Sequence, residues 1–367
     1  MLADVPPVAR VPLLVLGMLS LLFGVLGGLA RLAVAVPPAA SAQAGAHAAL
    51  MIAAFFATVI SLERAVALGR SWAYLAPLAA GGGGLVLLLG GPLAPAQSLF
   101  VASSAMLLVA SVRIVQRQAA LFTVMLAIAA ACLMVGNLAW MASGSIHTAV
   151  PMWLSFIVLT IAGERLELTR FLPRRSMAAP AFVIVSASIV LGAAVSLWHE
   201  SAGLRVFAAG LFALAAWLLV FDIARHNARQ TGLTRFIAIC LLTGYVWLAL
   251  GAALGLGGAL TPGHGLRDAS VHAVALGFVF AMVFGHAPII FPAVLRVRIP
   301  YHPIFYVPLV VLHASLALRF GGTLADSFVL RQQGASVNAL ALVLFIATMI
   351  VSAFRGKSGA PTKHRRS

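Results

Sequence analysis

The sequence predicts an all-α, polytopic membrane protein with about 12 transmembrane helices in three pseudo-repeated four-helix units. Of its 367 residues, 62% are hydrophobic and 9% are charged, and the mean hydropathy is +1.07. A soluble domain has about a quarter charged residues. Uncharged apolar runs of about 20 residues, enough to cross the hydrocarbon core, recur along the chain. The runs are continuous rather than alternating, which excludes a β-barrel.

Each run is expected to form one helix. The expected helices cover residues 11–36, 45–66, 72–92, 96–115, 119–141, 147–166, 179–198, 203–224, 235–259, 269–292, 303–319 and 335–354. The small residues of segment 37–45 resemble a signal-peptidase site. Because the preceding run is longer than a usual signal core and contains Arg31, we expect segment 1–42 to be retained, with the first helix intact.

The basic residues indicate the orientation of the helices. The net charge is +16, but the arginines stand at the ends of the apolar runs and do not cluster with aromatic residues. This pattern argues against a nucleic-acid partner and indicates the lipid bilayer instead. With the N-terminus inside, 19 of the 24 lysines and arginines face the cytoplasm. The positive-inside rule therefore predicts that both termini are cytoplasmic.

A weak repeat divides the chain. The second expected helix begins at His47 and ends near Glu63-Arg64, and the sixth begins at His147 and ends near Glu164-Arg165. The tenth contains His272 near its start but has no such pair. We expect the Glu-Arg pairs to cap helix ends at the headgroup level. The repeats of this single membrane domain, 1–367, cover about 1–117, 118–230 and 231–355, and a basic tail follows at 355–367.

Two of the histidines near the outer face indicate a cofactor. A lone interfacial histidine is ordinarily hydrated and hydrogen-bonded. His47 and His272, however, are followed by small residues, Ala48-Ala49 and Ala273. These would let a planar macrocycle lie against the helix beside its axial ligand, and histidine is a standard ligand of haem iron. His286 lies fourteen residues after His272, about 21 Å along the helix, so we expect it outside that site. Because Pro288 and Pro292 follow it, we expect His286 to be part of a broken inner helix end.

The residues around both histidines resemble a known superfamily. AHAALMIAAFF, residues 46–56, and DASVHAVALGFVFAMVFGHAPIIFP, residues 268–292, resemble helices 2 and 10 of the haem–copper oxidase catalytic subunit. That subunit also has twelve helices in three pseudo-repeated units. The resemblance implies that His47 and His272 are the two axial ligands of one low-spin haem b. The haem propionates need cations, and Arg31, Arg267 and Arg331 are the basic residues available on the outer side. We assign the propionates to Arg331, which the resemblance favours, and to Arg31.

The resemblance also implies a remnant of the copper site. His147 and His199 stand where the oxidases place copper ligands, and Glu200 replaces a further histidine. Together with His264, these residues are the candidate copper ligands. Ser270 replaces the high-spin haem ligand, so the chain is not expected to reduce oxygen. What remains resembles the NnrS family of bacterial membrane proteins, which is associated with haem, copper and nitric-oxide metabolism.

Two functions from different classes follow. The first is a haem-binding, copper-binding protein of redox or nitrogen-oxide metabolism in the bacterial inner membrane. Its electron donor would be another protein or a quinol, and if it is an enzyme we expect an oxidoreductase. The second is a secondary transporter of a small solute without a bound metal. Gly81–Gly84 and Pro288 suit a transporter, but the expected spans contain almost no charge away from their ends.

Overall fold

The computed structural model describes residues 4–169 and 176–358 of the chain. Over those residues the chain is helical and has no β-strand. Twelve of the helical stretches are long and apolar enough to cross a membrane. The predicted all-α polytopic fold is therefore confirmed.

The helix bounds follow the apolar runs closely, because hydrogen bonding within a helix satisfies the backbone of each run in lipid. The elements are α1 (Pro7–Ala30), α2 (Pro38–Ser41), η1 (Ala44–Ala46), α3 (His47–Ala49), η2 (Leu50–Phe56), α4 (Ala57–Leu68), η3 (Ser71–Tyr74), α5 (Leu75–Leu88), α6 (Leu93–Arg117), α7 (Leu121–Ser143), α8 (Ile146–Thr169), α9 (Ala178–Val195), α10 (Glu200–Phe221), α11 (Ala224–Asn227), α12 (Gly232–Leu256), α13 (Arg267–His272), η4 (Ala273–Phe280), α14 (Ala281–Leu295), η5 (Pro303–Phe305), α15 (Tyr306–Leu324) and α16 (Phe328–Ser358).

Several helix ends differ from the expected ones, and the end of α1 and the start of α16 differ most. Helix α1 stops at Ala30 rather than at residue 36, and Ala33 adopts a left-handed conformation with φ of 54° just beyond it. Helix α16 begins at Phe328, seven residues earlier than expected. Helix α14 continues through both of its prolines to Leu295, so His286 lies inside a continuous helix and not at a broken end. A proline in a helix removes one hydrogen bond, and the packing of α14 against its neighbours outweighs that loss.

The three helices that carry the repeated histidines form the centre of the bundle. In the α3–η2–α4, α8 and α13–η4–α14 spans, 67 to 78% of the apolar stretch is buried, against at most 50% in the other nine described spans. Helix α8 contacts both η2 and η4. A site built from these helices is therefore held by the most protected part of the fold.

Both histidines with small neighbours are followed by a π-helical segment. The segment η2 begins three residues after His47, and η4 begins directly after His272. Helix α8, which carries His147, is regular throughout. π-Helical turns are rare and concentrate at functional sites because they turn side chains away from their regular helical positions. Among the described residues, π-helical segments follow His47 and His272 but not His147.

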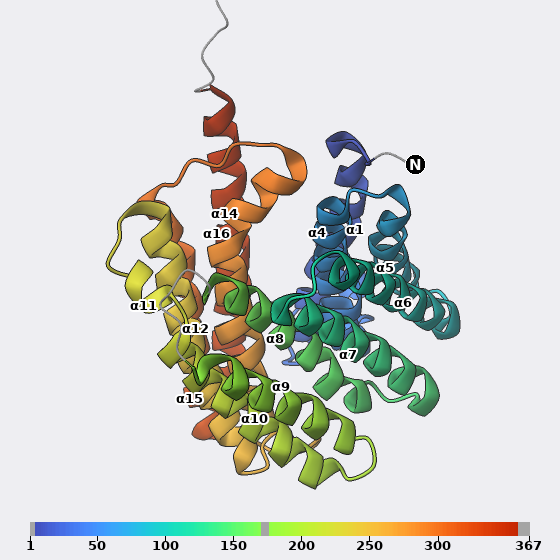
Figure 1. The fold of residues 1–367 in the computed structure, drawn as a ribbon. Coiled ribbons are helices and arrows are strands. Elements are labelled where there is room, and N and C mark those ends of the chain that lie inside the picture. Colours follow the sequence, from blue (N-terminus) through green and yellow to red (C-terminus); the bar gives the residue numbers. More distant parts are fainter. Residues whose placement is uncertain (1–3, 170–175, 359–367) are drawn as a thin grey trace, which may run out of the picture.

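Figure 1 shows where the two ends of the chain lie. The start of α1 and the end of α16 lie on the same side of the bundle, as an even number of spans requires. We call this the terminal side. The end of α1, the start of α3 and the start of α16 lie on the opposite side.

Candidate functional site

His47 and His272 face one another across a cavity at the opposite side. Their ring centroids are 6.3 Å apart, and the ring planes differ by 26°. Both side chains line a cavity of about 490 Å³, which we call the histidine cavity. Ligand pockets commonly have volumes of about 300–1,000 Å³. The structure therefore brings the two predicted axial ligands together, although 225 residues separate them in the sequence.

The ring of His47 is oriented by helix α1. Its Nδ1 lies 2.6 Å from the carbonyl oxygen of Gly24. Because a carbonyl only accepts, Nδ1 must carry the proton, and Nε2 is left with a free lone pair. Gly28 permits this arrangement, since a Cβ there would lie 2.8 Å from the imidazole. The ring is thus fixed in the tautomer that a metal ligand requires.

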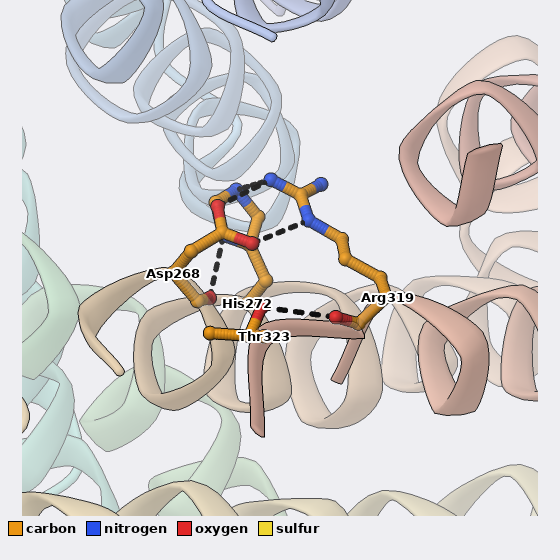
Figure 2. A network of polar contacts seen from close by, with 4 residues as sticks. All are labelled: Asp268, His272, Arg319 and Thr323. Atoms are coloured by element: carbon orange, nitrogen blue, oxygen red, sulfur yellow. Dashed lines mark hydrogen bonds and ion pairs between the residues drawn. The ribbon is translucent and has the colours of Figure 1, made fainter. Parts of the chain in front are cut away.

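His272 has the same tautomer by the same means. Its Nδ1 lies 2.9 Å from the carbonyl oxygen of Asp268, one turn earlier in the helix. Nε2 is the acceptor and lies 3.2 Å from a terminal nitrogen of Arg319 (Figure 2). Both histidines therefore direct a protonated Nδ1 at backbone and keep an unprotonated Nε2.

Arg319 is held by a two-pronged ion pair. Its Nε and Nη2 atoms donate hydrogen bonds to the two carboxylate oxygens of Asp268, at 2.8 and 2.6 Å. Figure 2 shows how this pair lies beside His272 and how Thr323, one turn along α15, donates its hydroxyl to the carbonyl of Arg319. Such paired, parallel bonds are the strongest arginine–carboxylate contacts and fix the plane of the guanidinium.

The cavity wall carries an excess of positive charge. Arg31, Arg267, Arg319 and Arg331 line it, whereas Asp268 is the only acidic residue among its described lining residues. The Nε of Arg331 is buried without a hydrogen-bond partner. With one carboxylate set against four guanidinium groups, the wall is suited to an anionic ligand.

The sequence predicted two of these arginines, Arg31 and Arg331, and both line the cavity. It did not assign Arg319 to this site. Arg319 lies on α15, 47 residues after the His272 that it contacts, and no spacing rule connects those positions. The only available signal was the cost of an arginine in an apolar helix, which marks functional or paired residues in general.

The four candidate copper ligands are not gathered in one place. His147 and Glu200 line a second, smaller pocket of about 230 Å³, and His147 and His264 line the histidine cavity. His199 lines neither of the two and precedes α10 as an exposed residue. Within residues 4–169 and 176–358, no three histidine, cysteine or acidic side chains lie together as a metal site would require. The copper assignment stays a prediction.

Ser270 faces away from the cavity. Its hydroxyl donates to the carbonyl oxygen of Gly251 on α12 at 2.8 Å, and the side chain is fully buried. Ser270 therefore links α13 to α12.

Comparison with known proteins identifies the family of the chain. The family model of a domain of unknown function, DUF8744, matches residues 10–354, so the chain belongs to the DUF8744 family. No match is found among the curated proteins.

Proposed function

We propose that this protein binds one haem b between His47 and His272 and acts as an electron carrier in the membrane. The observation that carries the proposal is the facing pair of imidazoles in one cavity, each with its Nδ1 bound to a backbone carbonyl. In metal sites, a hydrogen bond from the other ring nitrogen to a backbone carbonyl orients the histidine that binds the metal.

The separation of the rings fits ligation of one iron from both faces. A bond between a first-row metal and imidazole nitrogen is about 2 Å long, so two opposed nitrogens would be about 4 Å apart and the ring centres roughly 6 Å apart. The observed centroid distance is 6.3 Å. Two imidazole rings that pack together without a metal between them have no required distance between their centroids.

The charges fit the rest of the molecule. Haem b carries two propionates, and the excess of arginine in the cavity wall supplies partners for both. Arg331, whose buried Nε has no partner, and Arg31 are the residues we assign to the propionates. The contact of Arg319 with Nε2 of His272 must give way to the iron, while its two shorter bonds to Asp268 can remain.

Two histidine ligands leave no open coordination position, so a haem held in this way transfers electrons rather than binding a gas. The electron donor would be another protein or a quinol. The resemblance to the NnrS family supports a setting in bacterial redox or nitrogen-oxide metabolism. Copper is not part of this proposal, because its candidate ligands are dispersed.

An optical spectrum of protein purified from haem-replete cells tests the proposal. We expect a six-coordinate, low-spin b-type spectrum. His47→Ala and His272→Ala should each abolish or convert it, whereas His226→Ala, which removes an exposed histidine beyond the spans, should leave it unchanged. His286→Ala should also leave it unchanged, since that residue lies about 21 Å further along the helix.

The opposite result would favour the second function. If the protein is colourless, or if both His47 and His272 can be removed without a spectral change, the haem proposal fails. A transporter of a small solute then takes its place, and the histidine cavity would be its binding site.

A further inference from the structure

A second large cavity lies nearer the terminal side of the bundle. It has a volume of about 390 Å³, and residues of α1, α4, α8, α14 and α16 line it. In Figure 1, α1 and α4 are blue, and α14 and α16 are orange to red. Phe56 and Phe280 line both this cavity and the histidine cavity, so these rings stand between the two. We call it the glutamate cavity, because Glu63 and Glu164 are its acidic lining residues.

Most of the charged groups around the glutamate cavity are already neutralised in pairs. Glu164 accepts a bond of 2.6 Å from Arg64 of α4, so the two repeated Glu-Arg pairs contact each other across helices instead of capping separate ends. Arg165 forms a buried ion pair of 3.1 Å with Asp222. These two pairs cancel in charge.

His286 is also satisfied and neutral. Its Nδ1 lies 2.8 Å from the carbonyl oxygen of Met282, which requires a proton on that nitrogen. Its Nε2 lies 3.3 Å from a terminal nitrogen of Arg165 and must be the acceptor, because arginine only donates. The imidazole therefore brings no charge to the cavity.

Glu63 is left over. Its carboxylate lines the cavity, and within the described part of the chain no hydrogen bond or ion pair links it to another residue. An isolated carboxylate in apolar surroundings is costly until it binds a proton or a cation, so a carboxyl group in this position attracts positively charged ligands. The described lining residues of the cavity include no lysine or arginine, and the nearby Arg64 and Arg165 are engaged with Glu164 and Asp222.

The rest of the wall suits an organic cation rather than a hydrated metal ion. Besides Glu63, Glu164 and His286, the only polar residue among the described lining residues is Thr160. All the others are apolar. The aromatic ones are Phe55, Phe56, Phe280, Phe284, Phe291 and Phe345. Aromatic faces attract alkylated ammonium groups, and the attraction grows when water is absent.

We propose that the glutamate cavity binds a lipophilic organic cation, with its charge against Glu63 and its apolar substituents among the phenylalanines. The ligand class is an ammonium or phosphonium ion with aryl or alkyl substituents that partitions into the bilayer. A hydrated metal ion lacks the oxygen ligands it would need in this wall. This inference does not depend on the haem proposal, because the two cavities use different polar residues.

Two probes of the same shape and opposite charge test the inference. Tetraphenylphosphonium and tetraphenylborate are added to the purified full-length protein in a non-ionic detergent, and binding is measured by equilibrium dialysis. We expect saturable binding of tetraphenylphosphonium at one site per chain and at least about tenfold weaker binding of tetraphenylborate. Equal binding of the two ions to the wild-type protein would overturn the proposal.

Matched variants locate the charge that is responsible. Glu63→Gln should weaken tetraphenylphosphonium binding by at least about tenfold and remove the preference for the cation. Asp326→Asn makes the corresponding change from carboxylate to amide at an exposed residue in the turn between α15 and α16, and it should have no effect. Unchanged binding in folded Glu63→Gln protein would refute the assignment to Glu63.

A measurement on the wild-type protein covers the case in which Glu63→Gln does not fold. A lipid-soluble carbodiimide modifies carboxyl groups in apolar surroundings, and the labelled residue is identified by mass spectrometry. Tetraphenylphosphonium should slow the labelling of Glu63 at least about tenfold, whereas tetraphenylborate should not. If Glu63 is labelled at the same rate with and without the cation, the ligand does not occupy this cavity and the proposal is wrong.

Discussion

The imidazole of His47 occupies the space in which a side chain of Gly28 would begin. A Cβ built at Gly28 would lie 2.8 Å from both Cε1 and Nδ1 of the ring, closer than real Cβ atoms approach other atoms. Gly28 lies one turn after Gly24, whose carbonyl binds the same ring. Helix α1 therefore determines both how near the imidazole of His47 lies and which way it faces.

Gly28→Ala should move the His47 ring out of its position. A methyl group at 2.8 Å from the ring forces either the imidazole or α1 to shift, and the bond to Gly24 would be lengthened. We expect haem retention to fall by about tenfold or more, with a high-spin component in the optical spectrum. Gly45→Ala is the matched control, since nothing lies within 4 Å of a Cβ there. A low-spin spectrum equal to that of the control would show that α1 does not position the ring.

Breaking the ion pair beside His272 should destabilise the protein. Arg319→Gln leaves the Asp268 carboxylate without its two short bonds, and removing one partner of a largely buried pair costs about 3 kcal/mol. We therefore expect a lower midpoint of thermal unfolding in detergent. The double variant Asp268→Asn/Arg319→Gln should recover part of the loss, because neither charge is then left alone. A double variant with the summed loss of the two single variants would indicate that the residues do not interact.

Arg331→Gln should loosen the haem without removing its ligands. The propionate would lose a charge-assisted hydrogen bond worth roughly 1.5–3 kcal/mol, which corresponds to a weakening of haem retention of about tenfold to hundredfold. The spectrum should stay low-spin, since both histidines remain. Arg205→Gln, at an exposed arginine of α10 that lies outside the histidine cavity, is the control. Equal haem loss from both variants in a transfer assay would remove Arg331 from the propionate site.

Reporter fusions should place both termini in the cytoplasm. The motivation is the predicted division of 19 basic residues on the terminal side and five on the other. Tags after Ser367 and in the 170–175 segment, which lies outside the described residues, should be cytoplasmic. A tag near Gly144, in the turn between α7 and α8, should be external. A C-terminal reporter that is active only outside the cell would reverse the orientation.

Much of the fold could be predicted from the sequence. Each transmembrane helix makes its backbone hydrogen bonds within itself, so its apolar run can be recognised without knowing which helices pack against it. The apolar runs indicated twelve spans, and residues 4–169 and 176–358 contain twelve helical stretches long and apolar enough to cross a membrane. The misplaced ends lie where local chemistry competes with hydropathy. Ala33 turns the chain early, and α16 extends seven residues beyond its most apolar part.

The sequence by itself determined the twelve spans, the balance of basic residues and the choice of His47 and His272 as a pair, because composition and neighbouring residues carry that information. Only the tertiary structure decided that the centroids of these rings lie 6.3 Å apart and that Arg319 contacts His272. It also decided that Glu63 lines the glutamate cavity with no hydrogen bond or ion pair to another described residue. Contacts between helices depend on how each helix is rotated about its axis. In this chain two π-helical segments change that rotation directly beyond the histidines, which no periodic pattern of apolar residues records.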